Sequence, residues 1–79
     1  MNWQDYIEQR PDIMMGKPVF KGTRLTVESV LERLGQGWTD ADLFNSYPKL
    51  TRDHVKAACA FAAASLSSDI TILVPEPAR

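Results

Sequence analysis

The sequence predicts a small, mostly α-helical domain in which a short N-terminal β-ribbon precedes three helices that form a helix-turn-helix unit. Two helical patterns flank a tight turn within residues 37–64, and a third lies just before them. The chain has 79 residues, so we expect one domain over residues 1–66 and a tail over residues 67–79. A core this small often gains support from a second subunit, so we expect a homodimer.

The β-ribbon is predicted over about residues 6–24 from two short strand-prone stretches, at residues 6–9 and 17–21. Pro18 cannot donate a hydrogen bond to a ladder, so it belongs at a strand edge or a strand start. A lone ribbon is marginal in water, so it must pack on the helices or pair with a second subunit.

The first two helices are predicted over residues 27–35 and 40–47 from their caps and apolar stripes. Thr26 is a good N-cap for the first, whose stripe consists of Val27, Val30, Leu31 and Leu34. Thr39 caps the second, and Asp42 three residues later makes a capping-box-like start. Pro48 ends this helix, because the residue before a proline disfavours the helical region.

The third and longest helix is predicted over residues 52–66, with Thr51 as its cap. One face, which we expect to be buried, holds Val55, Ala58, Cys59, Ala62 and Leu66. The opposite, exposed face holds Asp53, Ala57, Ala60 and Ala64, with Arg52, Lys56 and Ala63 on its flank. Cys59 is therefore expected to be a buried structural thiol. Ser67 and Ser68 break the pattern, and the tail contains a strand-prone stretch at residues 70–74.

Charge and composition limit the classes of function. The net charge of −1 argues mildly against strong DNA binding, because phosphate neutralisation supplies most of such affinity. A single cysteine excludes an internal disulfide, and the absence of a signal sequence and of a membrane-length apolar run indicates a reducing cytoplasm. No pair of titratable groups is spaced for acid–base chemistry and no metal-ligand cluster is visible, so we expect neither an enzyme nor a cofactor.

The helix-turn-helix pattern nevertheless predicts a DNA-facing surface at the start of the third helix. The side chains free to meet a base edge or phosphate are Lys49, Arg52, Asp53, His54 and Lys56. The alternative is that a trihelical core simply places this helix on the surface, with His54 an ordinary surface histidine. Lys17, Lys21 and Arg24 form a second basic group on the ribbon, which is either a phosphate-binding arm or a solvated hairpin.

Two stretches are candidates for contact with a protein partner. The alanine face of the third helix would let another helix or sheet approach closely; its candidate residues are Ala57, Ala60, Phe61 and Ala64. The alternative is that alanine is frequent on this helix only because of its high helix propensity. In the tail, Ile70, Ile72, Leu73 and Val74 would add a strand to a partner sheet, or pair with the ribbon of this chain or of a second subunit.

A longer pattern connects these features. Residues 11–27 read PDIMMGKPVFKGTRLTV, and the segments GQGWT at 35–39, NSYPKLT at 45–51, VKAA at 55–58 and FAA at 61–63 follow in order. Over roughly residues 6–64, this pattern closely resembles the bacterial and archaeal family known as domain of unknown function 433. The resemblance implies a homeodomain-like three-helix fold with an N-terminal β element. It also implies an antitoxin of a type II toxin–antitoxin pair that neutralises a PIN-like ribonuclease toxin, with binding to its operator DNA as a further activity. The competing interpretation is a protein-interaction module that has inherited the helix-turn-helix geometry without nucleic-acid binding.

Overall fold

The computed structural model describes residues 1–69 and confirms the predicted fold class, a short antiparallel ribbon followed by three helices. In chain order, the elements are η1 (Trp3–Asp5), β1 (Ile7–Glu8), η2 (Met14–Gly16), β2 (Val19–Phe20), α1 (Val27–Gly35), α2 (Asp40–Ser46) and α3 (Arg52–Asp69). The two strands pair with Ile7 opposite Phe20 and Glu8 opposite Val19. The predicted tail strand at residues 70–74 lies outside the described residues.

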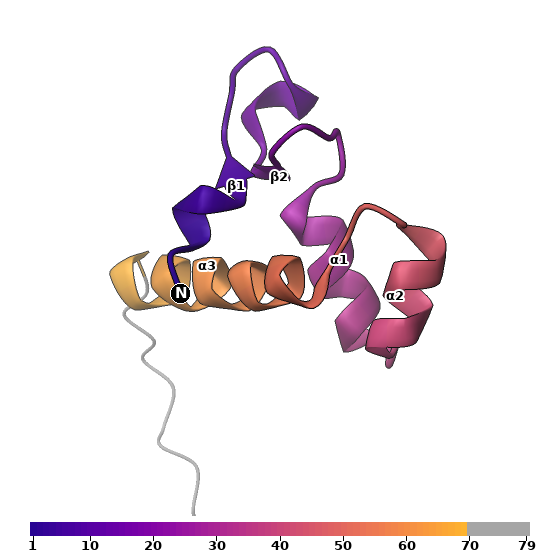
Figure 1. Ribbon diagram of the computed structural model, residues 1–79. Helices are drawn as coiled ribbons and strands as arrows, with labels where there is room; N and C mark the ends of the chain where they lie inside the picture. The colour runs from indigo at the N-terminus through magenta and orange to yellow at the C-terminus, as the bar shows by residue number, and fades with distance from the viewer. Residues whose placement is uncertain (70–79) are drawn as a thin grey trace, which may run out of the picture.

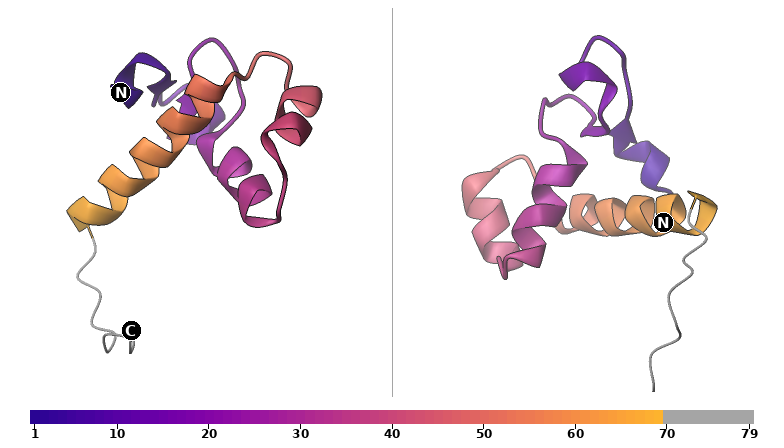
Figure 2. Two further views of the ribbon diagram at one scale, coloured as in Figure 1. Left: turned by 60° about the horizontal axis from the view of Figure 1, so that its bottom comes forward. Right: turned by 180° about the vertical axis from the view of Figure 1, so that it is seen from behind.

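The helices set the shape of the molecule. α1 and α2 lie near the start of α3, and the ribbon lies near the start of α1, away from α2 (Figure 1). The C-terminal half of α3 extends away from α1 and α2 (Figure 2). It is covered in part by η1, where the rings of Trp3 and Phe61 meet edge-on with centroids 4.9 Å apart. The N-terminal segment therefore supports the long helix at and beyond Phe61.

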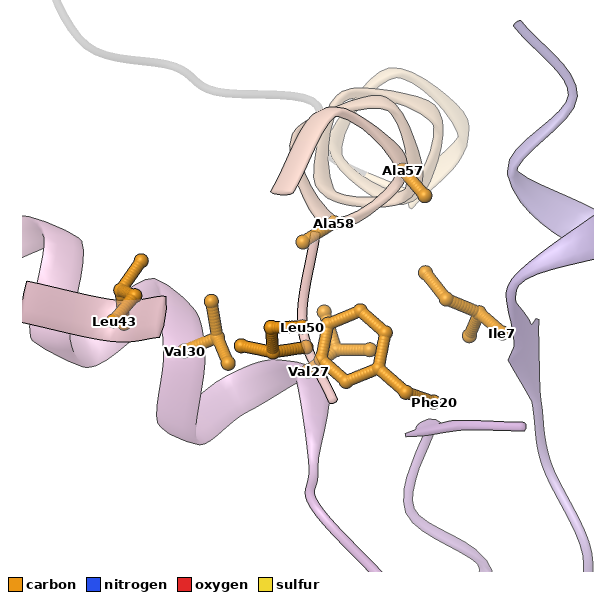
Figure 3. Packing of buried hydrophobic residues seen from close by; sticks show 8 residues of the cluster. All are labelled: Ile7, Phe20, Val27, Val30, Leu43, Leu50, Ala57 and Ala58. Atoms are coloured by element: carbon orange, nitrogen blue, oxygen red, sulfur yellow. The ribbon is translucent and has the colours of Figure 1, made fainter. Parts of the chain in front are cut away.

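The core is a single cluster to which every strand and α-helix contributes. It consists of Ile7, Phe20, Val27, Val30, Leu43, Leu50, Ala57 and Ala58. Phe20 lies beside Val27 and Leu50, between the ribbon and the helices (Figure 3). Because each element supplies only one or two buried side chains, the ribbon and the helices stabilise each other through this one cluster.

The first two helices begin where their caps predict. The Thr26 hydroxyl accepts a hydrogen bond from the backbone N–H of Ser29 at 3.1 Å. At α2, Thr39 and Asp42 form a reciprocal capping box, with bonds of 2.9 and 3.2 Å. These bonds satisfy backbone donors that have no partner within the helix. α2 ends at Ser46, one residue before the predicted end.

The predicted orientation of the third helix is wrong. Ala57 was expected on the exposed face but is fully buried beside Ala58, whereas Cys59 is exposed and Leu66 is 57% exposed. The helix is rotated by about one residue, roughly 100°, from the predicted orientation. The reason is Phe61, the largest apolar side chain on the helix, which packs on Trp3 and turns its own side of the helix inward. The helix also continues through Ser67 to Asp69, so the serines do not end it.

Candidate nucleic-acid interface

The loop that follows β2 presents two cationic side chains from a tightly bonded turn. The Thr23 hydroxyl donates to the carbonyl oxygen of Phe20 at 2.8 Å and accepts from the N–H of Leu25 at 3.0 Å. The N–H of Phe20 donates to the carbonyl oxygen of Leu25 at 3.1 Å, which closes the turn. Lys21 and Arg24 are exposed on this turn, so their backbone positions are fixed while their charged ends remain in water.

The turn between α2 and α3 presents a third cation. The N–H of Tyr47 donates to the carbonyl oxygen of Leu43 at 2.8 Å, and the N–H of Leu50 donates to that of Tyr47 at 2.9 Å. Leu50 is buried in the core and anchors the turn there, while Lys49 beside it is exposed. The side chain of Lys49 is thus presented from a turn that is fixed at both ends.

The fold brings these two turns together. Lys21, Arg24 and Lys49 line one groove of about 500 Å³, and a neighbouring hollow is lined by Arg10, Arg24, Lys49 and Glu8. We call Arg10, Lys21, Arg24 and Lys49 the ribbon–turn patch. Arg10 forms an exposed ion pair with Asp12 at 3.4 Å, whereas within residues 1–69 the other three cations have no ion pair. The patch is therefore a positive surface in a chain of almost neutral net charge.

His54 lines the groove but is packed more closely than the surface histidine expected from the sequence. The ring is half-buried and lies edge-on to Tyr6 and Phe20, at centroid distances of 5.2 and 5.5 Å. Its Nδ1 accepts from the backbone N–H of Thr51 at 3.1 Å, and the Thr51 hydroxyl lies 2.9 Å from the same nitrogen. The hydroxyl that we expected to cap α3 thus contacts the histidine, and the imidazole joins the ribbon to the start of α3.

The other predicted cations of α3 lie outside the patch. Arg52 faces Asp40 of α2 with Nε and Oδ2 3.8 Å apart, and its side chain is 72% exposed. Such an exposed pair is weak, so the guanidinium remains available to a phosphate. Asp53 and Lys56 are also exposed, and neither lines the groove. The first five residues of α3 therefore offer Arg52 and Lys56 beside one acidic side chain.

Two ribbon residues differ from the sequence-based prediction. Lys17, grouped with Lys21 and Arg24 in the sequence, instead pairs with Glu28 of α1 at 3.2 Å and lines neither hollow. Arg10 was not predicted as a site residue but lines the second hollow with Arg24 and Lys49. The ribbon register gives no signal for Arg10, because pairing Glu8 with Val19 places the end of β1 beside the start of β2 and not beside the loop that follows it.

The predicted partner residues on α3 do not form one exposed face. Ala57 is in the core, Phe61 packs on Trp3, and Ala60 and Ala64 are half-buried. A different apolar groove, of about 370 Å³, lies between α1 and α3, with Phe61 and Leu66 in its lining. The other predicted partner residues, Ile70, Ile72, Leu73 and Val74, lie outside the described residues.

Two further searches of residues 1–69 gave negative results. They contain no group of three or more His, Cys, Asp or Glu side chains placed to hold a metal ion. In the same part of the chain, no helix combines the length and the apolar character needed to cross a membrane.

The chain is a small trihelical domain in which a two-stranded ribbon packs on three helices. Cations from the ribbon and from the α2–α3 turn lie on one surface of this domain. The family model described as Protein of unknown function (DUF433) matches residues 7–62, and the chain belongs to this family. The fold is similar to the crystal structure of a DUF433 member protein from Anabaena variabilis ATCC 29413, with a TM-score of 0.75 and 26% sequence identity. That similarity covers 81% of this chain and 63% of the other. None of the curated proteins compared with the chain matches it.

Proposed function

We propose that this protein is an antitoxin that binds operator DNA through the ribbon–turn patch and neutralises a PIN-like ribonuclease encoded beside it. One observation carries the DNA half of the proposal: cations that are distant in the sequence gather beside the helix-turn-helix turn. A helix-turn-helix unit uses its turn and the start of its second helix to contact DNA, and this is where Lys49 and Arg52 lie.

The local arrangement of charge favours DNA more than the net charge does. A net charge of −1 describes the whole chain, but a phosphate responds to charges within about one Debye length, roughly 8–10 Å. Around the groove, Lys21, Arg24 and Lys49 are opposed by no acidic lining residue, and only Glu8 enters the second hollow. We therefore expect contacts dominated by phosphates, with modest affinity and strong salt dependence.

The DNA half is tested by fluorescence anisotropy with labelled duplex from upstream of the protein's own gene, in a series of salt concentrations. Three to five phosphate contacts predict a slope of log K against log salt of roughly −3 to −5, and Lys49→Gln should reduce its magnitude by about 1. Lys17→Gln is the matched control, because this lysine pairs with Glu28 and lies outside the patch. Equal effects of the two variants, or no binding at low salt, would remove this half of the proposal.

The toxin half is tested separately by co-expression with the product of the neighbouring gene, followed by co-purification and growth rescue. We expect Lys49→Gln to keep the rescue while it weakens DNA binding, because neutralising a nuclease needs no operator contact. Loss of growth inhibition without a stable complex would contradict direct neutralisation.

The second candidate function is that of a protein-interaction module without nucleic-acid binding. It is favoured by the C-terminal half of α3, which extends from the domain with Leu66 57% exposed and an apolar groove beside it (Figure 2). A protein that captures its neighbour but ignores DNA at low salt would favour this candidate over the first.

A further inference from the structure

The groove beside the ribbon–turn patch has a composition that DNA binding alone does not require. Its lining includes the apolar and aromatic side chains of Phe20, Leu25, Tyr47 and Leu50, and its cations are Lys21, Arg24 and Lys49. The exposed surface of the groove is mostly apolar. A duplex presents phosphates and sugars on a convex surface and has no apolar group of a size to fill such a hollow.

Size and composition both fit a small-molecule site. Sites for small ligands have volumes of about 300–1,000 Å³, with mostly hydrophobic and aromatic walls and a few polar groups that fix orientation. The groove has about 500 Å³, and all its fully charged lining residues are cations. Apolar walls favour an apolar body, and three cations favour a negative head group.

The two walls of the groove are already formed without a ligand. Thr23 bonds to both sides of its loop, and Gly22 completes the turn at φ +77°, a conformation that favours glycine. On the opposite side, the bonds of Tyr47 and Leu50 hold the α2–α3 turn. A preformed site loses little conformational entropy on binding, so even a small ligand keeps most of its interaction free energy.

His54 adds a hydrogen-bond donor to the lining. Because the N–H of Thr51 donates to Nδ1, the hydrogen of the neutral imidazole is on Nε2. His54 is one of the lining residues, so the groove combines this ring with the three cations. Within residues 1–69, the lining contains no carboxylate that would repel a negative head group.

We propose that this groove binds a small amphipathic anion, in which a carboxylate or phosphate head group is joined to an aromatic or branched apolar body. The head group lies among Lys21, Arg24 and Lys49, and the body lies against Leu25, Tyr47 and Leu50. The site does not depend on the proposed function, since it stands whether or not the protein binds DNA. Where DNA does bind, the ligand and the phosphates compete for Arg24 and Lys49.

The test is a titration of the full chain, without DNA, followed by ¹H–¹⁵N correlation NMR with matched probes. 2-Naphthoate and 2-naphthyl phosphate carry the two head groups, 2-naphthamide has the same ring without charge, and acetate has the charge without the ring. We expect the two anionic naphthyl probes to shift the amides of Gly22, Thr23 and Leu50. We expect 2-naphthamide to bind about threefold to tenfold more weakly than 2-naphthoate. We expect acetate to cause no shift at millimolar concentration. The stronger of the two anionic probes identifies the head group.

Variants locate the site. Arg24→Gln and Lys49→Gln should each weaken 2-naphthoate binding by about threefold to tenfold, whereas Lys17→Gln should leave it unchanged. The same spectra report whether each variant is folded, so loss of structure is recognised directly. Equal binding of 2-naphthoate and 2-naphthamide, no shifts at millimolar concentration, or an equal loss in Lys17→Gln would overturn the proposal. A failure to bind DNA leaves this result unaffected, so the two proposals are tested independently.

Discussion

Replacing Leu43 by alanine tests how strongly α2 depends on its one fully buried side chain, beside which the half-buried Phe44 also packs on the core. Leu43 has no exposed surface and is the buried residue of α2, a helix of only 7 residues. A helix this short is not stable alone in water, so it persists because it is docked. Leu43→Ala therefore removes the most deeply buried contact between α2 and the core.

The size of the effect follows from burial. A buried leucine replaced by alanine loses about 2–5 kcal/mol, from the transfer of the removed atoms and the cavity that remains. A domain of 79 residues has a total free energy of unfolding of about 4–12 kcal/mol. The variant should thus lose a large fraction of its stability. Leu66→Ala is the matched control, because this leucine is 57% exposed, and we expect a loss below about 1 kcal/mol.

The assay is urea denaturation followed by circular dichroism at 222 nm and by tryptophan fluorescence in a Trp3→Phe background. Trp38 then reports on the start of α2, since its ring stacks with Tyr47 at 6.5 Å and Arg33 lies 5.3 Å from its centre. We expect the fluorescence transition of Leu43→Ala to move to lower urea concentration than that of Leu66→Ala. Equal losses in the two variants would refute the reasoning, as would a Leu43→Ala protein within 1 kcal/mol of the parent, a threshold of about half the smallest expected loss.

Three further substitutions, one of them with a matched control, test local features by urea denaturation. Gly22→Ala should lose about 1 kcal/mol, because φ is +77° and a Cβ there has no contact within 4 Å that would offset the strain. Met15→Gly should gain up to about 1 kcal/mol, because Met15 is 90% exposed at φ 57° and glycine relieves that conformation; an equal loss would show that the methionine is needed. Thr39→Ala should lose about 1 kcal/mol with the capping box, and Ser46→Ala, which is exposed outside the box, should lose less than half of that.

The parts of the fold that depend on local chemistry could be predicted from the sequence. Thr26 and Thr39 mark the starts of two helices because a hydroxyl one position before the first turn satisfies free backbone N–H groups wherever it occurs. The ribbon could be recognised from strand-prone stretches, although each strand has only two residues. These signals need no knowledge of which elements pack together.

The orientation of α3 depends on packing, and the sequence carries little information about it. Alanine is small and occurs on every side of this helix, so the periodic pattern scarcely distinguishes Ala57 from Ala60. Phe61 determines the buried side, but only because Trp3 of η1 lies where the two rings meet. That contact joins residues at opposite ends of the described chain, and no local pattern predicts it.

The ribbon–turn patch, like the orientation of α3, depends on packing between distant parts of the chain. Lys49 could be predicted from the turn in which it lies, but its proximity to Lys21 and Arg24 depends on how the ribbon is fixed to α3. The fixing contacts are hydrophobic and aromatic: Phe20 is buried under the turn, and the His54 ring lies edge-on to it while holding Thr51 at the start of α3. A substitution that weakens these packing contacts should separate the three cations without removing any of them. The binding properties proposed for this surface therefore depend on uncharged packing as much as on the charges themselves.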